Sequence, residues 1–152
     1  MKKYILLCLI AIGLFSSSCT DEHYYDYPNI YTKTFVVNHN MWQSASDDTG
    51  DYLYCTFNES KLTQNVMNNG LMLSYLYYKP SGLNESVMSP LPFSDFIVER
   101  DANGDVTFKS EEHFTVEYAV GSVTFILKVD DHYIGNEVPY YDSYEFALKL
   151  AW

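Results

Sequence analysis

The segment 114–129, FTVEYAVGSVTFILKV, decides the fold class. In its first half Phe114, Val116 and Tyr118 alternate with polar residues, and in its second half apolar residues stand at 123, 125, 127 and 129. A period of two is typical of a strand with one face in a core and the other in water. Gly121-Ser122 lies between the halves and suits a tight turn, so the segment predicts a β-hairpin.

The same period extends along most of the chain. The stretch 71–78 is apolar on both faces, which is typical of a central strand. Tyr75 and Tyr77 share a face with Leu71 and Leu73, so we expect both rings in the core. Further strands are predicted over 31–37, 51–57, 93–99, 106–109 and 146–152.

Residues 58–67 break this period. Leu62 and Val66 are four apart, the spacing of one helix face. Asn58 is a suitable N-cap that would put Glu59 in the first turn, and Asn68-Asn69-Gly70 can end the helix. We therefore expect a mainly β domain, an antiparallel β-sandwich of Ig-like or similar type, with one short helix.

Residues 1–18 have the order of a secretory signal peptide. Lys2 and Lys3 precede an apolar stretch, 4–15, which is followed by three serines. As a helix this stretch would span only about 18 Å, whereas the apolar core of a bilayer is about 30 Å thick. We therefore expect the segment to be removed rather than to span a membrane.

Cys19 resembles the lipidated cysteine that begins mature bacterial lipoproteins. Ser16 stands where such signals usually carry a large aliphatic residue, and Ser16 with Ser18 also fits an ordinary signal peptidase, which would leave Cys19 without lipid. Asp21 and Glu22 resemble the acidic residues that lead to surface display in Bacteroidota-type bacteria. The prediction is an outer-membrane lipoprotein exposed at the cell surface, with the periplasmic face of that membrane as the alternative.

The chain thus divides into a signal peptide, 1–18, an acidic, tyrosine-rich tether, 19–29, and a β-sandwich domain, 30–152. Without the signal, 7 Lys and Arg remain against 20 Asp and Glu, so the net charge is −13. This charge excludes nucleic acid as a partner, because nucleic-acid binding requires clustered cations. The expected partners are the membrane, through the lipid at Cys19, and a glycan or a surface protein.

Cys55 lies between Leu53 and Phe57 in the alternating pattern and shares their face, which predicts a small core residue rather than a reactive thiol. An unlipidated Cys19 would leave a disulfide between Cys19 and Cys55 open. His113 follows two glutamates and is predicted to lie at a solvated strand edge. The chain has no G-x-S-x-G, H-E-x-x-H or P-loop motif. We therefore expect a domain that is not an enzyme, with a surface hydrolase as the less favoured alternative.

Calcium is the one cofactor that the sequence suggests. Asp101, Asn103 and Asp105 have the spacing of a calcium loop, but the glycine and the bidentate glutamate of that motif are missing from their places. The Asn-Gly pair at 103–104 favours a hairpin turn capped by these side chains. A second oxygen-rich segment offers the candidate calcium ligands Asp130, Asp131, Glu137 and Asp142, together with Asn136.

Three aromatic residues are candidate ligand-binding residues. Tyr140 and Tyr141 follow Pro139 in a predicted surface loop, and Trp42 precedes a predicted loop over 44–51. Tyrosine and tryptophan combine a flat apolar face with a polar tip, which suits sugars and protein interfaces. We expect these rings to line a groove.

The run from Met41-Trp42 through Leu62-Thr63 and Asn69-Gly70 to Leu91-Pro92-Phe93 resembles small surface lipoproteins of Bacteroidota-type bacteria, from a family of unknown function. The resemblance spans about 35–150, supports the sandwich and implies no catalytic residue. The predicted function is a lipid-anchored cell-surface or outer-membrane domain with a non-catalytic binding or structural role. The alternative is a glycan-binding module of a polysaccharide-uptake system.

Overall fold

The structure is a computed structural model that describes residues 28–79, 84–131 and 142–152. The predicted signal peptide and most of the tether lie outside these ranges. The described strands are β1 (Ile30–Asn38), β2 (Gln43–Asp47), β3 (Gly50–Asn58), β4 (Leu71–Tyr78), β5 (Val87–Pro90), β6 (Phe93–Arg100), β7 (Val106–Ala119), β8 (Ser122–Asp131) and β9 (Ser143–Ala151). A 3-10 helix, η1 (His39–Met41), and a short α-helix, α2 (Gln64–Asn69), join some of them.

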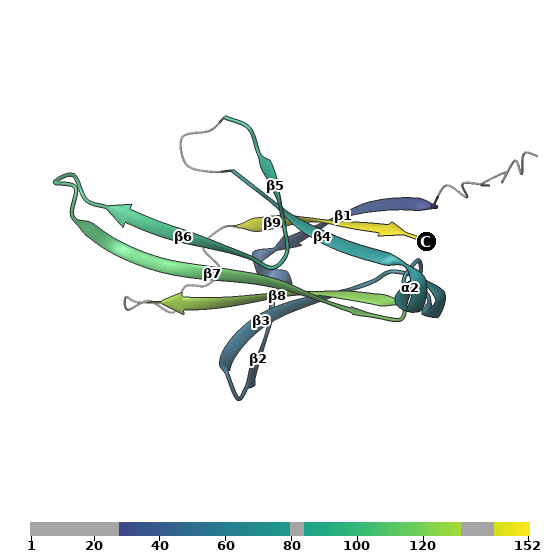
Figure 1. The fold of residues 1–152 in the computed structure, drawn as a ribbon. Coiled ribbons are helices and arrows are strands. Elements are labelled where there is room, and N and C mark those ends of the chain that lie inside the picture. Colours follow the sequence, from purple (N-terminus) through teal and green to yellow (C-terminus); the bar gives the residue numbers. More distant parts are fainter. Residues whose placement is uncertain (1–27, 80–83, 132–141) are drawn as a thin grey trace, which may run out of the picture.

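The strands form two antiparallel sheets that pack face to face (Figure 1). One sheet has the order β1-β9-β4-β5 and the other the order β2-β3-β8-β7-β6. Helix α2 lies at one end of the sandwich, between β3 and β4 in the chain. The predicted mainly β, antiparallel sandwich with one short α-helix is therefore confirmed.

The hairpin predicted from 114–129 is present as β7 and β8. Phe114 pairs with Leu127 and Val116 with Phe125, so the apolar residues of both strands share one face. Gly121 occupies the turn with φ of 84°, a left-handed conformation that favours glycine. Strand β7 is longer than predicted, because its backbone stays paired with β6 and β8 where polar residues interrupt the apolar pattern.

The core lies between the sheets and is rich in phenylalanine. Phe125 of β8 stacks on Phe146 of β9, with ring centroids 4.2 Å apart and planes 13° apart. Two further rings pack around this pair. The ring centroid of Phe35 on β1 lies 5.6 Å from that of Phe125, and the ring centroid of Phe114 on β7 lies 6.1 Å from that of Phe146. The stack joins the middle strands of the two sheets directly.

Strand β4 faces the opposite way from the prediction. Leu71 and Leu73 are exposed on the outer face, and Tyr75 and Tyr77 are only half-buried there, whereas Leu76 is buried. The assignment of the two tyrosines to the core is therefore wrong. The pairing of β4 with β9 decides the orientation, because Leu76 lies opposite the inward-facing Phe146.

The inward face of β4 carries one small polar residue, Ser74. Ser74 is buried, and the Tyr118 hydroxyl donates a hydrogen bond to its Oγ at 3.0 Å. This bond offsets the cost of placing a hydroxyl group between the sheets. Because Ser74 stands on the inward face, the outward face of 71–78 is the more apolar of the two in sequence.

Helix α2 begins later than predicted. Thr63 is its N-cap, with Oγ1 accepting a hydrogen bond from the Val66 amide at 3.3 Å, and Asn58 instead ends β3. Leu62 and Val66 are both buried, as their spacing indicated. The predicted loop over 44–51 is also corrected, since most of it belongs to β2 and the start of β3, joined by a tight turn.

Glu59 is buried, and it lies before α2 rather than in the first helical turn where it was predicted. Its Oε2 accepts hydrogen bonds from Tyr31 Oη at 3.0 Å and Lys33 Nζ at 2.9 Å, and its Oε1 accepts one from the Lys61 amide at 2.9 Å. The Glu59 amide donates to the carbonyl of Gly121 at 2.8 Å. The Glu59 carboxylate therefore links β1 to the segment before α2. The hydrogen bond from the Glu59 amide links the same segment to the β7–β8 turn.

Burial alone would raise the pKa of Glu59, but the hydrogen bonds from Lys33, Lys61 and Tyr31 outweigh it and hold the pKa below its ordinary value of 4.5. A carboxyl group whose pKa is lower in the folded state stabilises the fold above its unfolded pKa. That contribution is lost as the pH falls from about 4.5 through the lower folded value. Stability should therefore decline over this acidic range.

Glu59→Gln should lower the free energy of unfolding at pH 7 by about 1.5–3 kcal/mol, the usual worth of hydrogen bonds to a charged group. It should also flatten the dependence of stability on pH below 4.5, measured by urea unfolding at several pH values. The exposed Glu117→Gln is the matched control and should change neither quantity. An unchanged pH dependence in Glu59→Gln would contradict the role of this carboxylate.

Cys55 lies in the core, as its alternation predicted. Its side chain is 4% exposed, and burial raises the pKa of the thiol. A buried, protonated thiol reacts slowly, because the thiolate is the nucleophile. Thiol reagents should label Cys55 of the native protein only at the rate of unfolding, and rapidly in denaturant; fast labelling of the native protein would show that the site is open.

Candidate ligand-binding site

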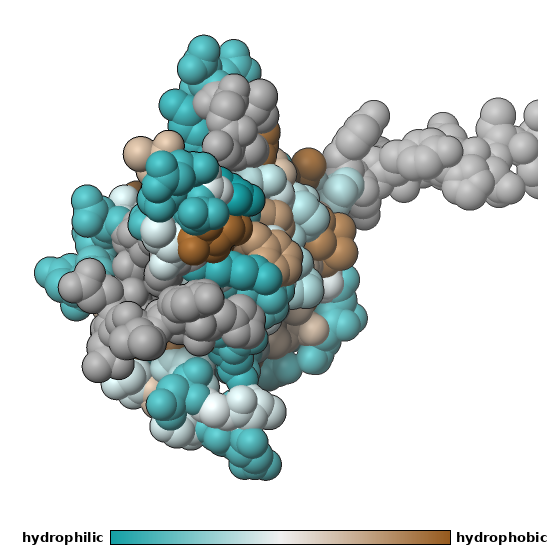
Figure 2. Space-filling view, turned by 90° about the vertical axis from the view of Figure 1, so that its left-hand side faces the viewer, coloured by the Kyte–Doolittle hydropathy of each residue, from teal (hydrophilic) through white to brown (hydrophobic). Residues whose placement is uncertain are grey.

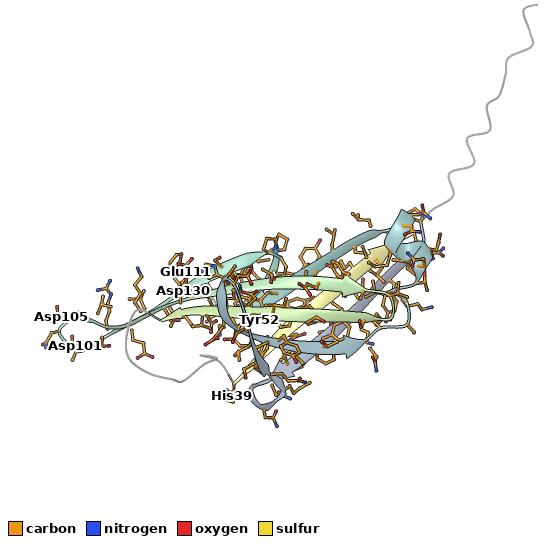
Figure 3. The ribbon with its side chains drawn as sticks, turned by 90° about the horizontal axis from the view of Figure 1, so that it is seen from below. His39, Tyr52, Asp101, Asp105, Glu111 and Asp130 are labelled. Carbon is orange, nitrogen blue, oxygen red and sulfur yellow. The ribbon has the colours of Figure 1, made fainter. Side chains whose placement is uncertain are left out.

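The most prominent concave surface in the described part of the chain lies on the outer face of the five-stranded sheet. It is a groove of about 620 Å³ that crosses β2, β3, β8 and β7. We call it the tyrosine groove and define it by Tyr52, Tyr54, Thr56, Thr124, Ile126 and Lys128. Figure 3 looks onto this sheet and shows Tyr52 lying over it.

The alternation of β3 and β8 brings these side chains together. Phe125 and Leu127 point into the core, so Thr124, Ile126 and Lys128 point outward. Tyr54 lies opposite Ile126 on the neighbouring strand, and Thr56 opposite Thr124. The groove is therefore the direct consequence of the same register that builds the core.

Two tyrosine rings form the aromatic part of the groove. The ring centroids of Tyr52 and Tyr54 are 6.3 Å apart, and the Tyr54 hydroxyl donates to Gln43 Oε1 at 2.9 Å. Lys128 Nζ lies 5.6 Å from the centre of the Tyr52 ring. Both tyrosines are half-buried, so each keeps some aromatic surface in contact with solvent.

Lys128 is held at the rim by the β2–β3 turn. Its Nζ lies 3.7 Å from Asp47 Oδ1 and hydrogen bonds to the Thr49 hydroxyl. The hydroxyl and the amide of Thr49 donate to Asp47, and these bonds lower the pKa of that carboxyl. The cation is thus drawn toward the turn, and the lining also carries the carboxylate of Glu117, opposite Thr124 on β7.

Hydroxyl groups line the floor and one end of the groove. Thr56 Oγ1 and Thr124 Oγ1 are 2.9 Å apart, and Thr115 extends the row of threonines onto β7. At the end of the groove, Ser94 Oγ lies 2.8 Å from His113 Nδ1. The groove therefore combines flat aromatic surface with several groups that can donate and accept hydrogen bonds.

Beside His113 lie two carboxylates, Glu111 and Asp130 (Figure 3). His113 Nε2 is 3.4 Å from Glu111 Oε1 and 3.6 Å from Asp130 Oδ2. Their ligand atoms lie within 4.8 Å of one another, the one such group among the described residues. Such exposed groups often lie together without a metal, so the cluster does not by itself indicate one.

His113 was predicted at a solvated strand edge. The structure instead places it on β7, which lies between β8 and β6 in the sheet. Together with Ser94 and Asp130, His113 has the composition of a hydrolytic triad. A triad needs its carboxylate to hydrogen bond and orient the imidazole, and here both carboxylates are beyond good hydrogen-bonding distance and accessible to water. Neither carboxylate therefore holds the imidazole as a triad requires.

Of the aromatic residues predicted to line a groove, Trp42 is described, and it does not line this one. Trp42 packs edge-on against Tyr144, with ring centroids 6.1 Å apart, and contacts the core. Tyr140 and Tyr141 lie outside the described residues. Tyr52 and Tyr54 were missed, although their outward positions in the alternating segment 51–57 were a usable signal.

The predicted calcium ligands are only partly described. Asp130 is exposed and lies beside His113, whereas Asp142 is exposed and accepts a hydrogen bond from the His39 amide through its backbone carbonyl. The side chain of Asp131 and all of Glu137 lie outside the described part of the structure. This segment therefore stays a prediction.

The turn at 101–105 is a capped hairpin, as expected. Asp101 Oδ1 accepts hydrogen bonds from the amides of Asn103 at 2.8 Å and Asp105 at 3.0 Å. Gly104 adopts φ of 91°, the left-handed conformation that such turns require. The oxygen atoms of Asp101 thus serve the turn itself.

Comparison with protein families, with curated proteins and with solved structures finds no match for this chain. No helix among the described residues is long and apolar enough to cross a membrane.

Proposed function

We propose that this protein is a lipid-anchored binding domain of the outer membrane, displayed at the cell surface, which binds its ligand in the tyrosine groove and catalyses no reaction. The tyrosine groove itself carries the proposal, because it is an open concavity that joins aromatic and hydroxyl groups on a rigid sheet. Such a combination is typical of a recognition surface.

A glycan is the ligand class that this surface favours. The apolar face of a sugar ring can stack on the Tyr52 and Tyr54 rings, while its hydroxyls can exchange hydrogen bonds with Thr56, Thr115 and Thr124. The open ends of the groove suit an oligosaccharide rather than a small enclosed molecule. This supports a glycan-binding module of a polysaccharide-uptake system over a purely structural role.

The anchor is proposed at Cys19. Ten residues lie between it and Ile30, where β1 begins, so eleven residue steps join the two. An extended chain of this length spans at most about 36–40 Å. The tether can therefore hold the groove well clear of the lipid surface, where a soluble polysaccharide can reach it.

The full chain, solubilised in detergent, should bind glycans on an array, and Tyr52→Ala or Tyr54→Ala should weaken that binding by about tenfold, the equivalent of about 1.4 kcal/mol. Phe96→Ala is the matched control, because Phe96 is an exposed aromatic residue on β6 of the same sheet, outside the lining of the groove. Melting temperatures of all three variants should stay close to that of the wild type.

Three further results bear on the proposal. Equal binding with calcium and with a chelator would remove calcium from the account. Normal binding by both tyrosine variants would contradict the groove as the site. Release of new reducing ends from a bound glycan would contradict the non-catalytic role.

Cys19→Ala should abolish lipid attachment. Cells given a clickable fatty acid should label the wild-type protein and not the variant, and the wild type should fractionate with the outer membrane. More than one acyl chain gives stable anchoring, since each buried CH₂ contributes about 0.8 kcal/mol. An unlabelled, soluble wild type would show that the cysteine begins a secreted protein instead.

A further inference from the structure

The outer face of the four-stranded sheet exposes apolar side chains in contiguous rows. Ile30, Val36, Leu71, Leu73 and Met88 are 37–77% exposed, and the pairing of the strands places them on one face. Figure 2 views the sandwich from one end and shows brown apolar residues among teal polar ones in the middle of the molecule and on its right-hand side. Apolar patches of this kind mark interaction sites.

The charge of this face differs from that of the whole chain. Its charged residues in the described strands are Glu145 and Lys149, both on β9, so the face is neutral on a chain of net charge −11. Lys149 Nζ lies 5.0 Å from the centre of the Tyr75 ring, in the middle of the apolar rows. A neutral face with one charge of each sign suits an identical face better than a charged partner.

We propose that a second copy of this chain covers the face in a two-fold symmetric dimer. Glu145 and Lys149 lie two residues on either side of Ala147. The two-fold axis would lie between the four-stranded sheets of the two copies, perpendicular to the strands, and would pass over Ala147. It places Glu145 of each copy opposite Lys149 of the other. The same axis places Leu73 over Tyr77 of the second copy, because these residues pair with Lys149 and Glu145.

The size of the face fits a reversible dimer. Strands lie about 4.8 Å apart and rise about 3.3 Å per residue, so three long strands and one short one cover roughly 500 Å² in projection. Two such faces together would bury about 1,000 Å² in projection, near the least that a biological interface usually buries.

The dimer leaves the tyrosine groove free and does not depend on it. The groove is on the outer face of the other sheet, so the two copies present their grooves on opposite sides. The proposed axis keeps the β1 edges of both copies on one side of the dimer. Both chains therefore enter their sandwiches from the same edge, as two chains held by one membrane require.

Thr34 tests the contact in the full-length protein, because it pairs with Ala147 and lies on the proposed axis. Facing sheets lie about 10 Å apart, too far for a disulfide, so a short bifunctional maleimide is the probe. Thr34→Cys should be cross-linked to itself in intact cells. Thr56→Cys, an exposed position in the groove, is the matched control, and the wild type should show no product because Cys55 is buried.

Charge exchange tests the axis. In the Thr34→Cys chain, Glu145→Lys or Lys149→Glu puts like charges opposite each other and should reduce the cross-linked fraction severalfold. The two substitutions together should restore it. Cross-linking of Thr34→Cys no greater than that of Thr56→Cys would overturn the dimer, and a double variant as weak as the single variants would overturn this arrangement. If lipid or another protein covers the face instead, Thr34→Cys should cross-link no more than Thr56→Cys.

Discussion

The stacking of Phe125 on Phe146 is the contact on which the rest of the structure depends. Their rings lie 4.2 Å apart and join β8, in the middle of one sheet, to β9, inside the other. Side chains alternate between the faces of a strand, so an inward residue fixes the direction of every other side chain on that strand. The pairing register then determines which side chains of the neighbouring strands face the core.

The tyrosine groove and the apolar outer face of the four-stranded sheet both follow from these inward orientations. With Phe125 inward, Thr124, Ile126 and Lys128 face outward and meet the tyrosines of β3 in the groove. With Phe146 inward, Glu145 and Lys149 lie on the opposite surface of the molecule beside the exposed Leu71 and Leu73. One face of the sandwich is therefore polar and aromatic, and the other apolar and neutral. These characters suit different tasks, recognition of a ligand and contact between copies.

The sequence predicted the elements whose pattern is local and unambiguous. The hairpin of 114–129, the buried Cys55 and the buried pair Leu62 and Val66 all follow from spacing within a few residues. The orientation of β4 does not, because Leu73 and Leu76 are equally apolar and only the partner strand decides which is buried. Glu59 was misplaced for a similar reason, since its partners Tyr31 and Lys33 lie 26–28 residues away.

The candidate site depends on residues that are still farther apart in the sequence. The groove joins Tyr54 to Ile126, which are adjacent only after β3 and β8 pair. No spacing within the chain reveals that adjacency, although the outward positions on 51–57 could have directed attention to the tyrosines. Strands β2 and β5 are short and carry little apolar pattern, so they were read as loops or not noticed.

Hydroxyl-radical footprinting of the native full-length protein, read by mass spectrometry, tests the account most directly. Leu73 and Leu76 lie three residues apart on β4, and they are 40% and 1% exposed. In a dilute, monomeric sample Leu73 and Tyr54 should be oxidised, whereas Leu76, Tyr144 and Phe125 should stay protected until the protein unfolds. Oxidation of Leu76 with protection of Leu73 in a monomeric sample would mean that β4 faces the other way, and would contradict the register from which both surfaces follow.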